Sequence, residues 1–131
     1  MDRLAWVCLG SAIGGGARYL VSLAALNLLG ASFPWGTLVV NVVGSFLISF
    51  IMHVAVETTL VPPLVRIFLT TGVMGGLTTY STFNFETLGY AAEGDWPRAG
   101  ANLAVTVVAC IAAGVLGVAS GRALVVNFGA N

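Results

Sequence analysis

The chain has 131 residues, of which 58% are hydrophobic and 8% charged, and its formal net charge is zero. A composition this apolar excludes a small soluble domain and predicts one integral membrane domain over residues 1–131, with the lipid bilayer as its surroundings. The balanced charge provides no basic surface for nucleic acid, and a lone histidine without a cysteine or a carboxylate pair beside it argues against an enzyme.

Three short polar or proline-bearing stretches divide the sequence into four apolar segments, at residues 4–29, 37–56, 64–92 and 98–126. Each segment has the ~20 residues that a helix needs to cross a bilayer, and lipid excludes irregular backbone. We therefore expect an all-α membrane protein of four transmembrane helices. Because four helices enclose little space, we also expect an oligomer.

The first segment contains two features that indicate what surrounds it. Gly10 and Gly14 are four residues apart, which allows close approach of a neighbouring helix. Arg18 lies inside the segment, where a charge is costly unless it faces a protein interior or a wet cavity. In a wet cavity, the fixed positive charge of Arg18 would raise the local concentration of anions.

The second segment carries a polar stripe at strict four-residue spacing. Its members are Thr37, Asn41, Ser45, Ser49 and His53. Such a stripe either joins helices by hydrogen bonds or lines a pathway, and the spacing alone leaves both interpretations open. Asn41 is the best pathway candidate because its amide carries two donor hydrogens.

The third segment has three glycines followed by a run of hydroxyl residues at its centre, between Gly72 and Phe83. This pattern predicts a helix that is broken near its centre, because threonine and serine can satisfy the freed backbone groups. Unwound carbonyls at this depth commonly bind a cation. The alternative is a kinked helix that packs without binding anything.

Glu86 follows on the same helical face as Thr79 and Thr82 and is an acid inside a membrane segment. It is a member of a polar track, a proton-coupling carboxylate, or a glutamate near a helix end that reaches toward water. The coupling role would make the protein a small proton-coupled multidrug exporter of four spans. We keep this as the alternative function and rank it second, because such an exporter needs a centrally placed acid and Glu86 lies nearer the end of its segment.

Three stretches, at residues 14–19, 36–44 and 71–83, resemble the signatures of the Fluc-type (CrcB) fluoride channels, in the same order and over nearly the whole chain. The resemblance implies a passive, highly selective channel that exports fluoride from the cytoplasm across the bacterial inner membrane. It also implies an antiparallel, dual-topology homodimer, with two pores along the subunit interface and a structural sodium ion at that interface.

The resemblance also assigns roles to particular residues. Backbone carbonyls of Gly75 and Thr78 hold the sodium ion. The anion pathway comprises the amide of Asn41, the paired aromatics Tyr80 and Phe83, the track residues Ser81, Thr82 and Glu86, and Asn102, which stands where relatives have an aromatic residue. Tyr80 also departs from the family pattern. Arg18 joins this pathway as a vestibule charge on the argument from its own position given above. Amides, hydroxyls and aromatic edges can replace the water around a dehydrated fluoride ion without binding it too tightly.

Overall fold

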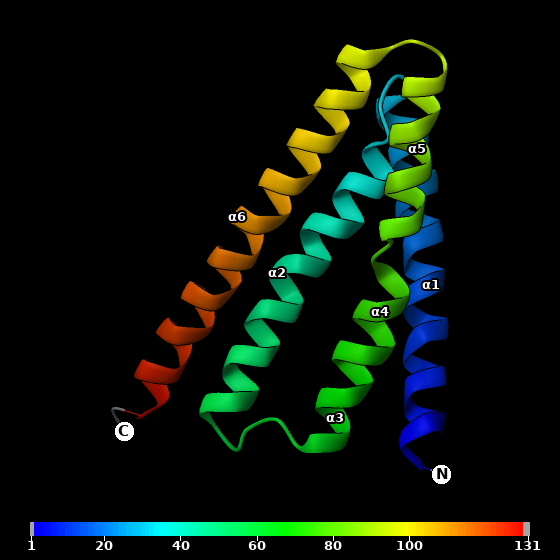
Figure 1. The fold of residues 1–131 in the computed structure, drawn as a ribbon. Coiled ribbons are helices and arrows are strands. Elements are labelled where there is room, and N and C mark those ends of the chain that lie inside the picture. The colour runs from blue at the N-terminus through cyan, green and yellow to red at the C-terminus, as the bar shows by residue number, and fades with distance from the viewer. Residues whose placement is uncertain (1, 130–131) are drawn as a thin grey trace.

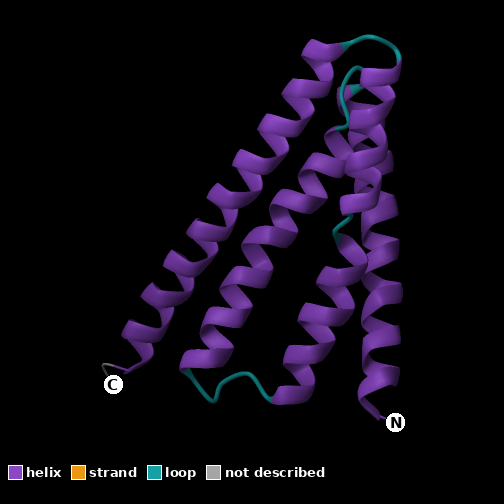
Figure 2. Cartoon of the chain, in the orientation of Figure 1, coloured by secondary structure: helices purple, strands orange, loops and turns teal. Residues whose placement is uncertain are grey.

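The computed structural model describes residues 2–129, and these residues fold into helices joined by short loops (Figures 1 and 2). The elements are α1 (Asp2–Leu29), α2 (Trp35–Glu57), α3 (Pro63–Ile67), the π-helical η1 (Phe68–Met74), α4 (Gly75–Leu77), α5 (Tyr80–Ala92) and α6 (Trp96–Gly129). Of these, α1, α2 and α6 are long and apolar enough to cross a membrane. The prediction of an all-helical membrane protein is confirmed.

The helix ends follow from local backbone chemistry. Gly30 follows α1 and Gly94 lies in the turn after α5, both at a φ of 79°, which glycine adopts without steric cost. Pro62 and Pro63 begin α3, where a missing N–H is harmless. These turns bring the helices back and forth, so that both chain termini lie at one end of the bundle (Figure 1).

Close helix packing depends on glycine in two places. A Cβ on Gly10 would lie 2.7 Å from the Phe68 carbonyl oxygen, and one on Gly76 would lie 2.5 Å from the Ser11 carbonyl oxygen. These glycines let α1 lie against η1 and α4. Along α6, Gly117 plays the same part against α2, since its Cβ would lie 3.1 Å from the Phe50 nitrogen.

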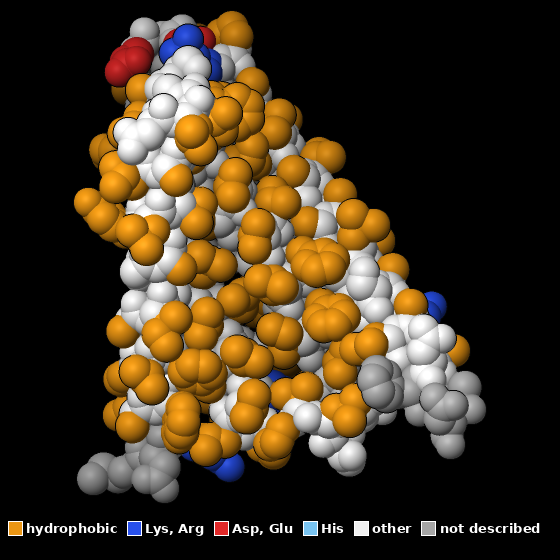
Figure 3. Space-filling view, turned by 180° about the vertical axis from the view of Figure 1, so that it is seen from behind, with side chains coloured by type: hydrophobic (Ala, Val, Ile, Leu, Met, Phe, Trp, Pro, Cys, Tyr) orange, Lys and Arg blue, Asp and Glu red, His pale blue; other side chains and the backbone are white. Residues whose placement is uncertain are grey.

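The outer faces of the bundle are apolar along most of their length. Large hydrophobic side chains are exposed on α1 and α6, among them Tyr19, Leu20, Leu28, Val108, Ile111 and Leu116. The space-filling view from behind shows hydrophobic side chains over most of this face, with the charged ones near its ends and edges (Figure 3). Such a surface is stable in lipid and not in water.

The segment from α3 to α5 runs between the same two ends of the bundle as the long helices (Figure 1). Its helical course is interrupted at Thr78 and Thr79, whose backbone is extended, with ψ angles of 155° and 108°. In Figure 2 this interruption is the short loop between two helical stretches. The side chains of Asn41, Ser81 and Thr82 lie within hydrogen-bond distance of Thr79 at this interruption.

Candidate functional site

Asn41 on α2 binds the backbone at the interruption with both ends of its amide. Its Nδ2 donates to the Thr79 carbonyl oxygen at 3.1 Å, and its Oδ1 accepts from the Thr79 N–H at 2.7 Å. Thr79 is buried, so neither backbone group has water as an alternative partner. Asn41 therefore secures the interruption to α2 and retains one amide hydrogen for any other acceptor.

Thr79 in turn caps the N-terminus of α5. Its Oγ1 accepts from the Thr82 N–H at 3.2 Å and donates to Thr82 Oγ1 at 2.9 Å. The hydroxyl of Ser81 lies 3.3 Å from the same oxygen. Because the side chains of Ser81 and Thr82 are exposed on this chain, the first turn of α5 presents a cluster of hydroxyl groups outward.

The same hydrogen bonds release two backbone carbonyls. In a continuous α-helix the N–H of residue i+4 donates to the carbonyl of residue i. Here the N–H of Thr79 goes to Asn41 and the N–H of Thr82 goes to the Thr79 hydroxyl. The carbonyls that lose these donors belong to Gly75 and Thr78. Oxygens freed in this way suit a monovalent cation, so the residues present fit the predicted sodium ligands.

A cavity of about 370 Å³, which we call the central cavity, lies beside the interruption. Its walls include Asn41, Gly75, Thr78, Tyr80, Phe83, Ser45, Thr70 and Thr106. The rings of Tyr80 and Phe83 have centroids 5.8 Å apart. Phe83 is buried, whereas Tyr80 is 78% exposed and projects away from its own chain. Five of the residues predicted from the sequence thus share one cavity.

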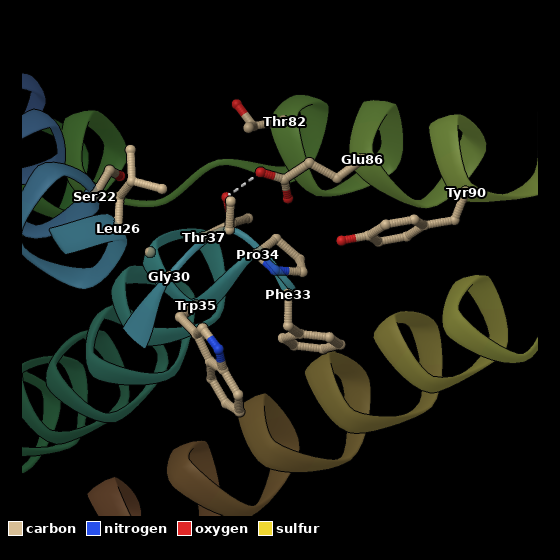
Figure 4. A pocket seen from close by; sticks show the side chains of 12 residues that line it. Ser22, Leu26, Gly30, Phe33, Pro34, Trp35, Thr37, Thr82, Glu86 and Tyr90 are labelled. Carbon is tan, nitrogen blue, oxygen red and sulfur yellow. Dashed lines mark hydrogen bonds between the residues drawn. The ribbon is translucent and has the colours of Figure 1, made fainter. Parts of the chain in front are cut away.

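The Glu86 cavity, of about 410 Å³, lies toward the end of the bundle away from the termini, and its walls include Ser22, Thr37, Thr82, Glu86 and Tyr90. The Thr37 hydroxyl donates to Glu86 Oε1 at 2.7 Å (Figure 4). Glu86 Oε2 is buried and has no hydrogen-bond partner among the described residues. Thr37 therefore positions the carboxylate inside the cavity.

Arg18 lines a neighbouring cavity of similar size, the Arg18 cavity, with Tyr19 and Thr79. Ser22, Thr37 and Thr82 line both this cavity and the Glu86 cavity, so the two adjoin. A guanidinium and a carboxylate are thus placed around one shared polar wall. This arrangement puts Arg18 beside a cavity, as the sequence predicts for a charge in this segment.

Asn102 is placed differently from the other candidates. It is 1% exposed and lies between α6 and α5, where its Nδ2 donates to Thr87 Oγ1 at 2.8 Å. Thr106 donates to its Oδ1 at 3.4 Å, and Thr87 donates to the Phe83 carbonyl oxygen at 2.8 Å. Within this chain Asn102 joins two helices and lines none of the three cavities described above.

Sequence reasoning did not find two parts of this site. One is the attachment of Asn41 to the Thr79 backbone, and the other is the Thr37–Glu86 hydrogen bond. The N-cap role of Thr79 could have been recognised, because threonine is a favoured residue immediately before the first turn of a helix. The contacts of Asn41 and Thr37 leave no such signal, since a polar stripe does not name its partners.

An all-helical membrane bundle whose polar cavities meet at a helix interruption is the architecture of a channel or transporter. A family model described as CrcB-like protein, Camphor Resistance (CrcB), matches residues 5–118. The chain belongs to this family.

Curated relatives agree with the family. The chain is 54% identical over 113 residues to the fluoride-specific ion channel FluC of Anaeromyxobacter dehalogenans (strain 2CP-1 / ATCC BAA-258), a match that covers 86% of this chain and 90% of the relative. It is 48% identical over 125 residues to the protein of the same name from Sorangium cellulosum (strain So ce56), covering 95% and 98%. The corresponding protein of Geobacter sp. (strain M21) is 41% identical over 124 residues.

Proposed function

We propose that this protein is a passive, highly selective fluoride channel of the bacterial inner membrane, which lets fluoride leave the cytoplasm. The observation that carries the proposal is the central cavity. Its available donors are the second amide hydrogen of Asn41, the hydroxyls of Ser45 and Tyr80, and two aromatic edges. The hydroxyls of Thr70, Thr78 and Thr106 also line it but donate to protein oxygens. None of the residues that line it is an acid or a base.

An uncharged cavity of donors suits fluoride for a physical reason. Fluoride is small and strongly hydrated, so it leaves water only where other donors replace its hydration shell. A cationic side chain in contact with the ion would hold it too long for fast conduction, and the lining of this cavity includes no lysine, arginine or histidine. The exporter alternative needs an acid at the centre of the path, and Glu86 lines a different cavity, bound to Thr37. None of the relatives described above is an exporter.

The two cavities near α1 would form one vestibule of this pathway. Arg18 attracts the anion, Thr82 lines both cavities beside Ser81 in the first turn of α5, and Glu86 lies one turn of α5 further from the central cavity. Asn102 contributes by holding α6 against α5 beside Phe83. In this arrangement the anion passes from a charged vestibule to uncharged donors, which favours both capture and release.

The functional unit is an antiparallel homodimer whose subunits are inserted in both orientations. Tyr80 supports this proposal, because an aromatic side chain that projects from its own chain beside the pathway would complete a path shared with a second copy. Residues 64–92 then form the third of four spans, broken at Thr78 and Thr79. A single four-span domain fits the short loops between the helices.

Sodium is the proposed structural ion of this dimer. The carbonyls of Gly75 and Thr78 lack the N–H donors of a continuous helix, and both residues line the central cavity. A bound sodium ion would supply a positive centre that ties the two subunits together at the interruption. This chain's part is to keep those carbonyls free of helical N–H donors, through the bonds of Asn41 and Thr79.

The test is fluoride efflux from liposomes that contain the purified protein, followed with a fluoride electrode under an imposed voltage. Fluoride should leave rapidly without a pH gradient, while chloride should stay. A requirement for the pH gradient would contradict the channel and favour the exporter. Equal efflux of chloride would contradict the proposed selectivity.

A further inference from the structure

The polar stripe of α2 lines one cavity after another along the bundle. Thr37 lines the Glu86 and Arg18 cavities, while Asn41 and Ser45 line the central cavity. Ser49, one turn further, lines a fourth cavity of about 640 Å³, which we call the Arg122 cavity. Each residue of the stripe can therefore be assigned to one of the two interpretations, joining helices or lining a path.

The first half of the stripe joins helices, and the second half does not. Thr37 and Asn41 are bonded to Glu86 and Thr79. The hydrogen bonds of the described residues include none from the hydroxyl of Ser45 or Ser49, although the hydroxyls of other residues, such as Thr70, do bond to a carbonyl of their own helix. The two serine hydroxyls thus remain available to whatever occupies the cavities.

Ser49 is left uncovered by a glycine on the facing helix. A Cβ on Gly114 would lie 3.3 Å from the Ser49 hydroxyl oxygen, so any larger residue there would cover it. His53, the last member of the stripe, lines none of these four cavities, and its ring packs against Gly121. The next residue of α6, Arg122, is exposed and lines the Arg122 cavity in its place.

The central and Arg122 cavities follow one another along the same pair of helices. On α2, Ser45 and Ser49 are one turn apart, and on α6, Cys110 and Gly114 are one turn apart, with one member of each pair in each cavity. The other walls of the Arg122 cavity are aliphatic, so its serine and arginine are the polar groups available to an ion.

We propose that Ser45, Ser49 and Arg122 form the second mouth of the anion pathway. Ser45 and Ser49 donate to the anion as it moves between the central cavity and water, and Arg122 concentrates anions at that mouth, as Arg18 does at the first. This inference rests on the proposed fluoride channel and extends it from one mouth to a path through the whole membrane. A lipid tail would be the other occupant suited to the aliphatic walls.

The test uses single-channel recording in planar bilayers over a range of fluoride concentrations, with elution on gel filtration matched to the wild type. Ser49→Ala should lower the maximal fluoride conductance about tenfold, the factor expected for one hydrogen bond to an ion. Ser120→Ala is the matched control, because Ser120 is exposed on α6 outside the four cavities, and it should conduct as the wild type does.

Arg122→Gln should act on the concentration dependence. Loss of one exposed unit charge should raise the fluoride concentration for half-maximal conductance roughly threefold to fivefold and leave the maximum nearly unchanged. Arg122→Lys should restore the wild-type value, since it keeps the charge. Arg3→Gln removes an exposed arginine that lines none of the four cavities and should have no effect.

Two results would overturn the inference alone. Wild-type conductance in Ser49→Ala would show that the hydroxyl does not meet the anion, as expected for a lipid-filled cavity. A fall in the maximal conductance of Arg122→Gln that Arg122→Lys does not repair would assign Arg122 to structure. Failure of the wild-type protein to conduct fluoride would instead refute the proposed function itself.

Discussion

Substitution of Asn41 tests whether this residue holds the interruption in place, because its amide makes two hydrogen bonds to the backbone of the buried Thr79. Asn41→Ala removes both partners of the Thr79 backbone, its N–H at 2.7 Å and its carbonyl at 3.1 Å. Each buried group left without a partner costs about 1–3 kcal/mol, so the interruption should lose roughly 2–6 kcal/mol of local stability.

That loss is measurable as amide hydrogen exchange. A cost of ~2 kcal/mol corresponds to an increase of about 30-fold in the open population of the Thr79 amide, since 1.4 kcal/mol is a factor of ten. The exchange rate of Thr79 should therefore rise at least ~30-fold in Asn41→Ala, together with a loss of fluoride efflux. Asn27→Ala, at the exposed end of α1, should change neither quantity.

Asn41→Asp separates the two bonds. A carboxylate still accepts from the Thr79 N–H but has no hydrogen for the Thr79 carbonyl and repels it. Exchange at Thr79 should stay slower than in Asn41→Ala, while efflux should fall as low or lower, because the negative charge also repels fluoride. If Asn41→Ala abolished efflux with wild-type exchange at Thr79, Asn41 would act only as a donor to the anion, and the positioning role would be wrong.

Three further outcomes follow from other parts of the site. Tyr80→Phe should conduct in liposome efflux and Tyr80→Ile should not, because fluoride is expected to meet the positive edge of the ring; full efflux in Tyr80→Ile would exclude that contact. Gly76→Ala should lower the free energy of unfolding by about 1–3 kcal/mol, and with it the melting temperature, because the new Cβ would lie 2.5 Å from the Ser11 carbonyl oxygen. Gly100→Ala, with nothing within 4 Å, is its control and should melt as the wild type does. Replacing sodium with a large organic cation should lower the melting temperature of the purified protein, and an unchanged melting temperature would count against sodium at Gly75.

The long helices could be predicted closely because lipid imposes a simple rule on sequence. The predicted spans at residues 4–29, 37–56 and 98–126 correspond to α1, α2 and α6, with ends that differ by three residues at most. The glycine spacing also predicted close helix contacts, since Gly10 and Gly117 lie where two helices touch. Length, apolarity and small residues are local properties, and they are visible without any knowledge of neighbours.

The function of each polar side chain is less local. The stripe on α2 is regular in sequence, yet Thr37 and Asn41 find partners that are 49 and 38 residues away, and Ser49 finds none among the described residues. Likewise, the position of Asn102 in the sequence does not reveal that its amide binds Thr87 on α5.

The sequence alone therefore determined that this is a helical membrane protein, where its helices run, and which residues are chemically able to meet an anion. Only the tertiary structure decided which of them are already bonded. Hydrogen bonds to side chains such as Asn41 and Thr37 form after helices pack, and packing sets their distances to within a few tenths of an ångström. A polar group that packing has satisfied holds the protein together, and a donor hydrogen that packing leaves unused, such as the second amide hydrogen of Asn41, is free to bind an ion.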